Sequence, residues 1–185
     1  MKRLKVGVIG AGAWGRNHVR TVAGLAEAEL AAVCDTDPKV RDRVARQFPN
    51  ALVSADISQL LGVVDAVIVA SPAATHAAVA RQVIEAGKPV LVEKPFALSA
   101  KDAEDVARAG AERGVPVLAG HLLVYHPAVE RLRDMVQTGD LGKVFYLYSL
   151  RVNLGQVRKD ENALWSFGPH DVSVALYLLG EPPIR

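Results

Sequence analysis

Cysteine is nearly absent from this sequence of 185 residues, and long apolar runs are missing altogether. The single cysteine, Cys34, excludes an internal disulfide and every metal motif built from several cysteines, and it fits a reducing compartment. No apolar run reaches the roughly 18 residues of a membrane span. The first residues lead into a short strand-like run rather than into the longer apolar core of a signal peptide. We therefore expect a cytoplasmic protein.

An excess of charge of one sign is also lacking. The sequence has 22 basic and 20 acidic residues, and they are dispersed along the chain. This balance points neither to nucleic acid nor to an anionic membrane as a partner. Half of the residues are hydrophobic, so the chain can bury a sizeable core, and its length allows one domain or two small ones.

The first 120 residues alternate short β-branched runs with amphipathic stretches, which predicts a parallel sheet covered by helices on both faces. The runs that read as strands are 4–9, 30–34, 51–54, 66–70, 89–92 and 115–119. The amphipathic stretches between most of them are 15–25, 38–48, 75–86 and 99–113. Six strands complete a doubly wound α/β sheet of the Rossmann type.

The pattern changes after Gly120. It predicts a helix over 127–137, a long strand over 143–153, a polar loop, and a helix over 169–179 that Pro169 begins. We therefore predict a dinucleotide-binding domain over 1–122 and the beginning of an α/β domain over 123–185. One long strand leaves open edges, so strands from elsewhere would have to pair with it.

A glycine-rich turn follows the first predicted strand and opens the first helix. Its glycines fit the pattern G-x-G-x-x-G: Gly10 makes the tight turn, Gly12 lets a pyrophosphate approach the backbone, and Gly15 allows close helix packing. Ala13 and Trp14 lie inside the turn, at the start of the helix, where free amide groups bind anions. We predict that this turn binds the phosphates of a dinucleotide.

An acidic residue stands where a dinucleotide site needs one. Asp35 comes twenty positions after Gly15, directly after the second strand, where its carboxylate can accept both ribose hydroxyls and repel a 2′-phosphate. NAD is therefore the expected cofactor. NADP stays an alternative, because Arg41 and Arg43 are near enough in sequence to contact a phosphate.

Two further strand ends carry candidate residues at the edge of the sheet where ligands bind. Ser71 and Pro72 follow the fourth strand, and His76 opens the next helix, either as a cofactor contact or as a capping or surface histidine. Glu93 and Lys94 follow the fifth strand. Burial and an oxidised nicotinamide both lower a lysine pKa, so Lys94 is a candidate for proton exchange with a substrate hydroxyl; the alternative is a surface loop lysine.

Taken in order, six short motifs resemble one family. They are the glycine-rich turn 10–15, Cys34-Asp35-Thr36-Asp37, Ser71-Pro72 with His76, Glu93-Lys94-Pro95, Gly120-His121 with His126-Pro127, and the segment from Leu164 to Asp171. The set resembles the glucose-fructose oxidoreductase, inositol dehydrogenase and rhizopine catabolism family, Gfo/Idh/MocA. The resemblance implies a Rossmann domain followed by a larger α/β domain whose sheet covers the substrate and often forms a homo-oligomer interface. It also implies NAD(P)-dependent oxidation or reduction of sugars, polyols and sugar nucleotides.

The resemblance also assigns roles beyond the cofactor. It implies that Lys94 and His170 are catalytic, with His170, at the expected start of a helix, as a neutral base; the alternative for His170 is a helix cap. Many polyol-oxidising members carry an aspartate where this sequence has Ser166. For Asp171 we favour capping over catalysis.

Residues expected to touch substrate are Lys94, His121, Asn153, Arg158, Trp165 and His170. Of these, Asn153 and Arg158 lie in the polar loop. The alternative for this loop is a solvated charged segment that binds no ligand. The segment around Trp165 resembles family members of polysaccharide or sugar-nucleotide metabolism. We expect no metal site, because His121 and His126 are five residues apart, outside helical ligand spacing.

These observations favour an oxidoreductase that transfers a hydride between nicotinamide and a hydroxyl-bearing carbon of a sugar, a polyol or a nucleotide-linked sugar. Family members are usually well over 300 residues long. The alternative is therefore a dinucleotide-binding module without turnover, as a redox sensor or a truncated remnant.

Overall fold

The computed structural model describes residues 3–151 and 163–182. The chain divides between Gly120 and His121 into two compact units, residues 1–120 and 121–185. Each unit is described by itself. None of the helices within the described ranges is long and apolar enough to cross a lipid bilayer.

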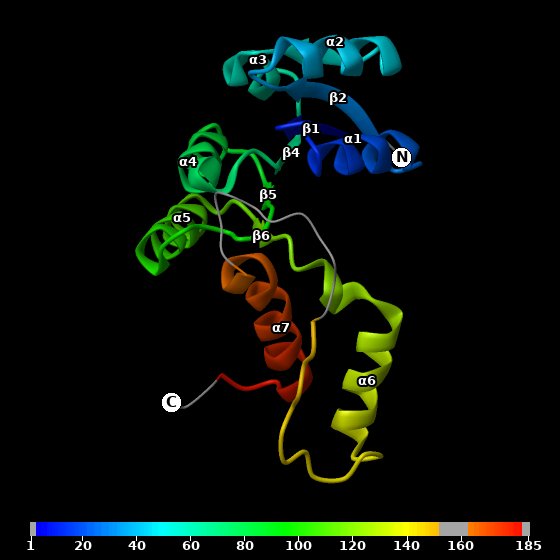
Figure 1. Ribbon diagram of the computed structural model, residues 1–185. Coiled ribbons are helices and arrows are strands. Elements are labelled where there is room, and N and C mark those ends of the chain that lie inside the picture. Colours follow the sequence, from blue (N-terminus) through cyan, green and yellow to red (C-terminus); the bar gives the residue numbers. More distant parts are fainter. Residues whose placement is uncertain (1–2, 152–162, 183–185) are drawn as a thin grey trace. The chain divides into compact units, whose positions relative to one another are not determined.

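The first unit is built on a six-stranded sheet in which every neighbouring pair of strands is parallel (Figure 1). The strands are β1 (Leu4–Ile9), β2 (Ala28–Cys34), β3 (Leu52–Ser54), β4 (Ala66–Val69), β5 (Val90–Val92) and β6 (Val117–Ala119). Their spatial order is β3-β2-β1-β4-β5-β6. This is the doubly wound order of a Rossmann fold, so the predicted fold class is confirmed.

Helices connect these strands, and their ends follow local sequence signals. They are α1 (Gly15–Gly24), α2 (Pro38–Gln47), α3 (Ile57–Leu61), the 3₁₀ turn η1 (Ala73–Thr75), α4 (His76–Glu85) and α5 (Ala100–Arg113). Asp37 and Ser99 cap α2 and α5 by accepting the Lys39 and Asp102 amides. The short helix α3 was not predicted; Asp56 caps it in the same way.

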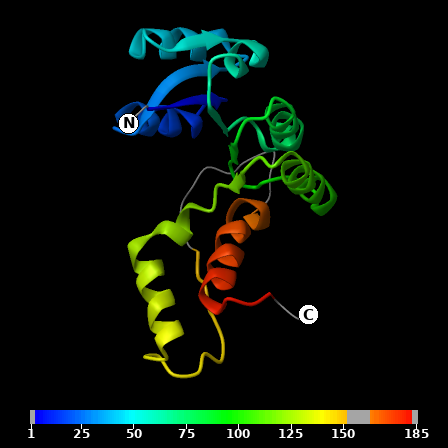
Figure 2. The ribbon, with the colours of Figure 1, turned by 180° about the vertical axis from the view of Figure 1, so that it is seen from behind.

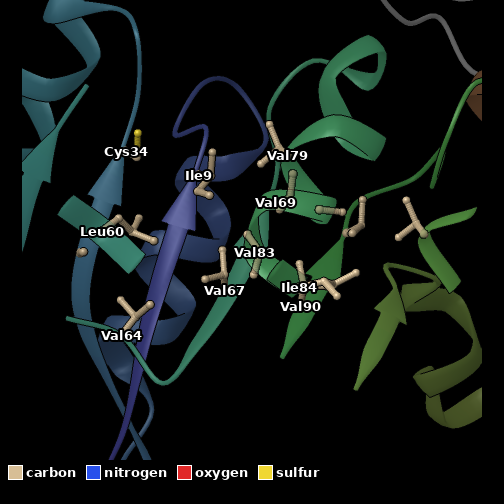
Figure 3. Packing of buried hydrophobic residues seen from close by; sticks show 14 residues of the cluster. Ile9, Cys34, Leu60, Val64, Val67, Val69, Val79, Val83, Ile84 and Val90 are labelled. Carbon is tan, nitrogen blue, oxygen red and sulfur yellow. The ribbon is translucent and has the colours of Figure 1, made fainter. Parts of the chain in front are cut away.

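Side chains on the two faces of the sheet form separate apolar clusters, as expected of parallel strands buried on both sides. One cluster joins the sheet to α1 and α2, through residues such as Val8, Val19 and Val44. The other joins it to α3, α4 and α5. Figure 3 shows this second cluster, where Ile9 of β1 and its strand partner Val69 of β4 pack with side chains of α4. The two clusters hold the strand ends in place, and the candidate site is built on these ends.

The second unit contains the 3₁₀ turn η2 (Leu122–Tyr125) and the helices α6 (Pro127–Thr138) and α7 (Ala163–Leu179). Both views show α6 beside α7 (Figures 1 and 2). Arg133 of α6 donates a hydrogen bond to the Tyr177 hydroxyl of α7 at 3.2 Å and lies over its ring, 4.4 Å from the centroid. This contact combines a hydrogen bond with a cation–π interaction.

The prediction of a strand over 143–153 is wrong for the residues that can be described. Residues 143–151 form no strand, and Phe145, Tyr146 and Tyr148 expose 82%, 84% and 78% of their surface. A strand exists only through hydrogen bonds to a neighbouring strand, and the described part of the second unit contains none. Strand-forming residue types alone are therefore not sufficient here.

The predicted start of the last helix is also wrong. We expected it at Pro169, but α7 begins at Ala163 and contains Pro169. Proline is most common in the first turn of a helix, which explains the error. His170 therefore lies inside the helix, and the argument that a helix N-terminus keeps its ring neutral no longer applies.

Candidate functional site

Three segments with candidate residues follow the carboxyl ends of neighbouring strands. The glycine-rich turn follows β1, Ser71 follows β4, and Glu93 follows β5. Strands β1 and β4 are adjacent although α2 and α3 lie between them in the chain, and the strand order reverses there. In open α/β sheets, ligands bind at such a switch point.

The three glycines of the turn differ in what surrounds them. Gly10 has a positive φ of 85°, and a Cβ there would lie 2.6 Å from the Ser71 nitrogen. A Cβ on Gly15 would lie 1.9 Å from the Gly10 carbonyl oxygen, so any side chain at position 15 would collide with the backbone. Among residues 3–151 and 163–182, a Cβ on Gly12 would meet nothing within 4 Å. Gly10 and Gly15 are required by the turn itself, whereas Gly12 borders open space.

The open space beside Gly12 fits the pyrophosphate of a dinucleotide. Within the described part of the chain, the backbone N–H groups of Gly12, Ala13 and Trp14 donate to no other residue. They lie at the start of α1, where the helix dipole favours negative charge. The turn thus offers unpaired donors, a positive helix end and space at one point.

Ala11 is held through both of its backbone polar groups. Its N–H donates to Oδ2 of Asp35 at 2.7 Å, and its carbonyl oxygen accepts from Nη2 of Arg43 at 2.7 Å. The other carboxylate oxygen, Oδ1, accepts the Asp37 amide at 2.9 Å. Each carboxylate oxygen has two lone pairs, so Asp35 keeps acceptor capacity for ribose hydroxyls.

Arg41 is bound to backbone carbonyls as well. Its Nη1 donates to the carbonyl oxygens of Asp35 and Thr36, both at 2.9 Å. The two arginines considered as phosphate ligands therefore brace the ends of β1 and β2. A guanidinium has five N–H donors, so each keeps others for a ligand.

Glu93 is a buried acid at the end of β5, with 5% of its surface exposed. Its Oε1 accepts from Trp14 Nε1 at 2.7 Å and lies 2.6 Å from Nε2 of His18, while Oε2 accepts the Lys94 amide at 3.1 Å. Burial raises the pKa of Glu93, but the hydrogen bonds from His18, Trp14 and Lys94 outweigh it and hold the pKa below its usual value. The carboxylate is therefore ionised, and His18 Nε2 carries the hydrogen of their contact.

His76 connects the turn after β4 with the turn after β5. Its ring is 2% exposed; Nδ1 lies 2.8 Å from the Pro95 carbonyl oxygen and Nε2 lies 2.7 Å from that of Ser71. The alternative of a surface histidine is therefore wrong. Next to it, the hydroxyls of Ser71 and Thr75 are 2.7 Å apart. In the chain, Pro72 lies between Ser71 and Thr75 and directly precedes η1.

Lys94 is half-buried at the same edge of the sheet, and its bond to Pro95 is cis. The backbone N–H of Lys94 is held by the Glu93 carboxylate. The carbonyl oxygen of the next residue, Pro95, contacts the ring of His76. All the residues predicted for the cofactor site thus lie at the carboxyl ends of the strands of the first unit.

The second unit holds the other candidates. His121 and His170 are half-buried, and Trp165 is 40% exposed. Asn153 and Arg158, predicted to bind substrate, lie outside the described residues. No group of three or more metal-ligating side chains occurs within residues 3–151 and 163–182.

Asp171 has a different role from the helix cap that we expected. Its Oδ1 accepts from Ser149 Oγ and from Arg151 Nε, both at 2.8 Å. Burial raises the pKa of Asp171. The hydrogen bonds from Arg151 and Ser149 and the charges of Arg151 and His170 lower it by more, so the pKa lies below its usual value. The carboxylate joins α7 to the segment before the polar loop.

Sequence reasoning missed His18 and Arg151. His18 lies four residues after Trp14, one helical turn further along α1, so helical spacing could have paired the two. Nothing in the sequence near Arg151 indicates Asp171 as its partner, which lies 20 residues away.

Comparison with known proteins agrees with this geometry. Residues 4–121 match the family model described as "Oxidoreductase family, NAD-binding Rossmann fold", GFO_IDH_MocA. The chain belongs to this NAD-binding oxidoreductase family, which confirms the resemblance in the six motifs and the expected cofactor class.

Individual relatives are dehydrogenases of polyols and nucleotide sugars. The chain is 33% identical over 184 residues to inositol 2-dehydrogenase 2 of Saccharopolyspora erythraea, covering 96% of this chain and 54% of the relative. It is 33% identical over 190 residues to UDP-N-acetylglucosamine 3-dehydrogenase of Acidithiobacillus ferrooxidans, covering 100% and 57%. The solved structure of GenD2 from gentamicin A biosynthesis in complex with NAD superposes with a TM-score of 0.86 at 32% identity, covering 100% and 56%. The chain thus spans about half the length of these proteins.

Proposed function

We propose that this chain carries the cofactor-binding part of a nicotinamide-dependent dehydrogenase acting on a hydroxyl-bearing carbon of a sugar, a polyol or a nucleotide-linked sugar. The observation that carries the proposal is the turn at Gly12: an open space lined by unpaired amides at a helix start, with Asp35 fixed beside it. This combination fits a dinucleotide whose adenosine ribose lacks a 2′-phosphate. We therefore expect NAD rather than NADP.

The residues of the first unit would bind and orient the cofactor. The amides of Gly12, Ala13 and Trp14 hold the pyrophosphate, and Asp35 accepts the ribose hydroxyls. Ser71, Pro72 and His76 shape the edge at β4. When bound, NAD supplies the hydride acceptor or donor. Lys94 binds the reacting substrate oxygen and stabilises negative charge on it.

The second unit would supply substrate contacts and a base. His170 accepts the hydroxyl proton, and His121, Asn153, Arg158 and Trp165 bind the remainder of the substrate. The substrate class rests on the six motifs and on the names of the relatives, an inositol dehydrogenase and a nucleotide-sugar dehydrogenase. We further propose that the protein is cytoplasmic and that copies associate through the second unit, whose residues 145–150 expose apolar side chains.

A titration with NADH and then NADPH tests the cofactor site without a substrate. Energy transfer from Trp14, inside the turn, reports binding. We expect saturable binding that prefers NADH. The matched variant is Gly12→Val, because a Cβ at position 12 would meet no described atom within 4 Å, while the side chain would fill the space offered to the pyrophosphate. This variant should fold normally and lose binding; wild-type protein that folds but does not bind would refute the proposal.

Hydride transfer is tested next, with a panel of polyols, sugars and nucleotide sugars and absorbance at the reduced nicotinamide band. Lys94→Ala and His170→Ala should each slow turnover of the best substrate by about 10²- to 10⁴-fold. If turnover were unchanged in a variant, the residue substituted in it would not be catalytic. Tight NADH binding without hydride transfer to any substrate would instead favour a cofactor-binding module.

A further inference from the structure

Glu93 is the meeting point of two segments that the proposed function uses for different purposes. Trp14 is the N-cap residue of α1 and His18 lies in its first turn, close in the chain to the phosphate-binding amides. Lys94 lies after β5, two strands away from β1 in the sheet. The Glu93 carboxylate accepts hydrogen bonds from both segments, at 2.7 Å and 2.6 Å from α1 and at 3.1 Å from the Lys94 amide.

The lone pairs of the carboxylate decide what Glu93 can do. Oε1 has two lone pairs, which accept hydrogen bonds from Trp14 and His18. One lone pair of Oε2 accepts a hydrogen bond from the Lys94 amide. The glutamate side chain is 7% exposed, whereas that of His18 is 23% exposed. Three of four acceptor positions of a buried acid thus serve the protein itself. From its position in the sequence we expected Glu93 to contact the cofactor. This count argues against such a contact as the main role of Glu93.

Burying an ionised carboxylate is costly unless hydrogen bonds compensate it, and here the contacts with Trp14, His18 and the Lys94 amide do so. An apolar side chain would fill the same place. What the carboxylate adds is a rigid connection between a helix start and a distant turn. Such connections fix functional groups to within about 0.5 Å of their working geometry.

We propose that Glu93 and His18 are positioning residues that couple the phosphate-binding turn to the turn of Lys94. His18 fixes the carboxylate of Glu93 from α1. Glu93 in turn orients the indole of Trp14 and the backbone of Lys94. The pyrophosphate and the reacting end of the dinucleotide are thereby bound in one geometry. This inference rests on the proposed function, since it concerns how the dinucleotide is held.

Binding and nuclear magnetic resonance on the same variants test the coupling. His18→Leu removes the donor, His18→Gln keeps a donor at the place of Nε2, and Thr21→Leu is a matched control on the exposed side of α1. Affinity for NADH is measured by calorimetry. The indole N–H signal of Trp14 and the amide signal of Lys94 are followed without ligand.

We expect His18→Leu to raise the Kd for NADH about tenfold, because the turn loses its fixed geometry. The Lys94 amide signal should shift, because the amide and His18 are bound to the same Glu93 carboxylate. His18→Gln should restore both the affinity and the signal, which a general loss of stability would not do. Thr21→Leu should change neither. Glu93→Gln, which cannot accept all three hydrogen bonds, should behave like His18→Leu.

The outcomes separate this inference from the function on which it rests. Wild-type protein that does not bind NADH refutes the proposed function and this inference with it. Binding by wild type with an unchanged Kd and an unshifted Lys94 amide in His18→Leu overturns the coupling alone. Weaker binding that His18→Gln fails to restore also overturns it, because the donor would then not be the relevant feature.

Discussion

Arg43 donates a hydrogen bond from Nη2 to the carbonyl oxygen of Ala11 at 2.7 Å, so a side chain of α2 holds the glycine-rich turn in place. In the sequence this arginine was a candidate for a 2′-phosphate contact. In the structure it supports the turn through the carbonyl group of Ala11, while Asp35 binds the amide of the same residue. The two side chains fix the two peptide planes on either side of the Ala11 Cα, next to the phosphate-binding amides.

Arg43→Ala should therefore lower the affinities for NADH and NADPH by similar factors, about three- to tenfold, since one hydrogen bond that orients the turn is lost. Parallel titrations with the two cofactors measure the effect. Arg46→Ala on the same helix is the control, because among the described residues Arg46 binds a carbonyl of its own helix and no other group. A loss confined to NADPH would show that Arg43 contacts a 2′-phosphate.

Asp35→Asn should shift the preference toward NADPH. The substitution removes the negative charge that repels a 2′-phosphate and one of the acceptors for the ribose hydroxyls. We expect the ratio of NADPH to NADH affinity to rise about tenfold. An amide oxygen can still accept from the Ala11 N–H, so the turn is retained. An unchanged ratio would mean that Asp35 serves the turn alone.

His76→Leu should destabilise the first unit by about 1 to 3 kcal/mol, because the carbonyl group that accepts the ring N–H would lose its hydrogen bond and the carbonyls of Ser71 and Pro95 would both face an apolar side chain. Urea unfolding measures the change. Gln82→Leu, on an exposed position of α4, controls for the new leucine. Equal stability of the two variants would contradict a structural role of the ring.

Glu93 should give the protein a stability that is lost in acid. Its pKa is lowered in the folded state, so the stabilisation is complete above the usual glutamate pKa of about 4.3 and disappears as the pH falls through the folded pKa. Glu93→Gln should cost about 2 kcal/mol at pH 7. The difference from wild type should therefore narrow as the pH falls from about 4.3 toward the folded pKa.

Unfolding by urea at several pH values checks this dependence. Glu85→Gln, an exposed position at the end of α4, is the control and should follow wild type. A difference between wild type and Glu93→Gln that stays constant down to pH 3 would contradict a lowered pKa of Glu93.

The features that the sequence predicts correctly are local ones. The turn from Gly10 to Gly15 and the place of Asp35 follow from spacing within one strand-turn-helix-strand unit. The six strands follow from β-branched runs that are buried on both faces. Each of these signals lies within about twenty residues, and the parallel sheet leaves few alternatives for arranging them.

What could not be predicted depends on partners far away in the chain. Trp14 and Glu93 are 79 residues apart, and only the folded sheet brings them together. The residues 143–151 have the composition of a strand, yet a strand needs a neighbour that the described chain does not offer. Proline is most common in the first turn of a helix, so Pro169 predicted a helix start, but α7 begins six residues earlier, at Ala163.

The one thiol of the chain has a practical consequence. Cys34 ends β2 with 3% of its surface exposed, and burial, together with the negative charges of Asp35 and Asp56, raises the pKa of its thiol. A thiol-specific reagent can therefore modify the native chain only after the strand next to the proposed adenosine site has opened. The rate of labelling at Cys34 measures how often this edge of the sheet opens, and NAD bound at Asp35 should slow it without any engineered probe.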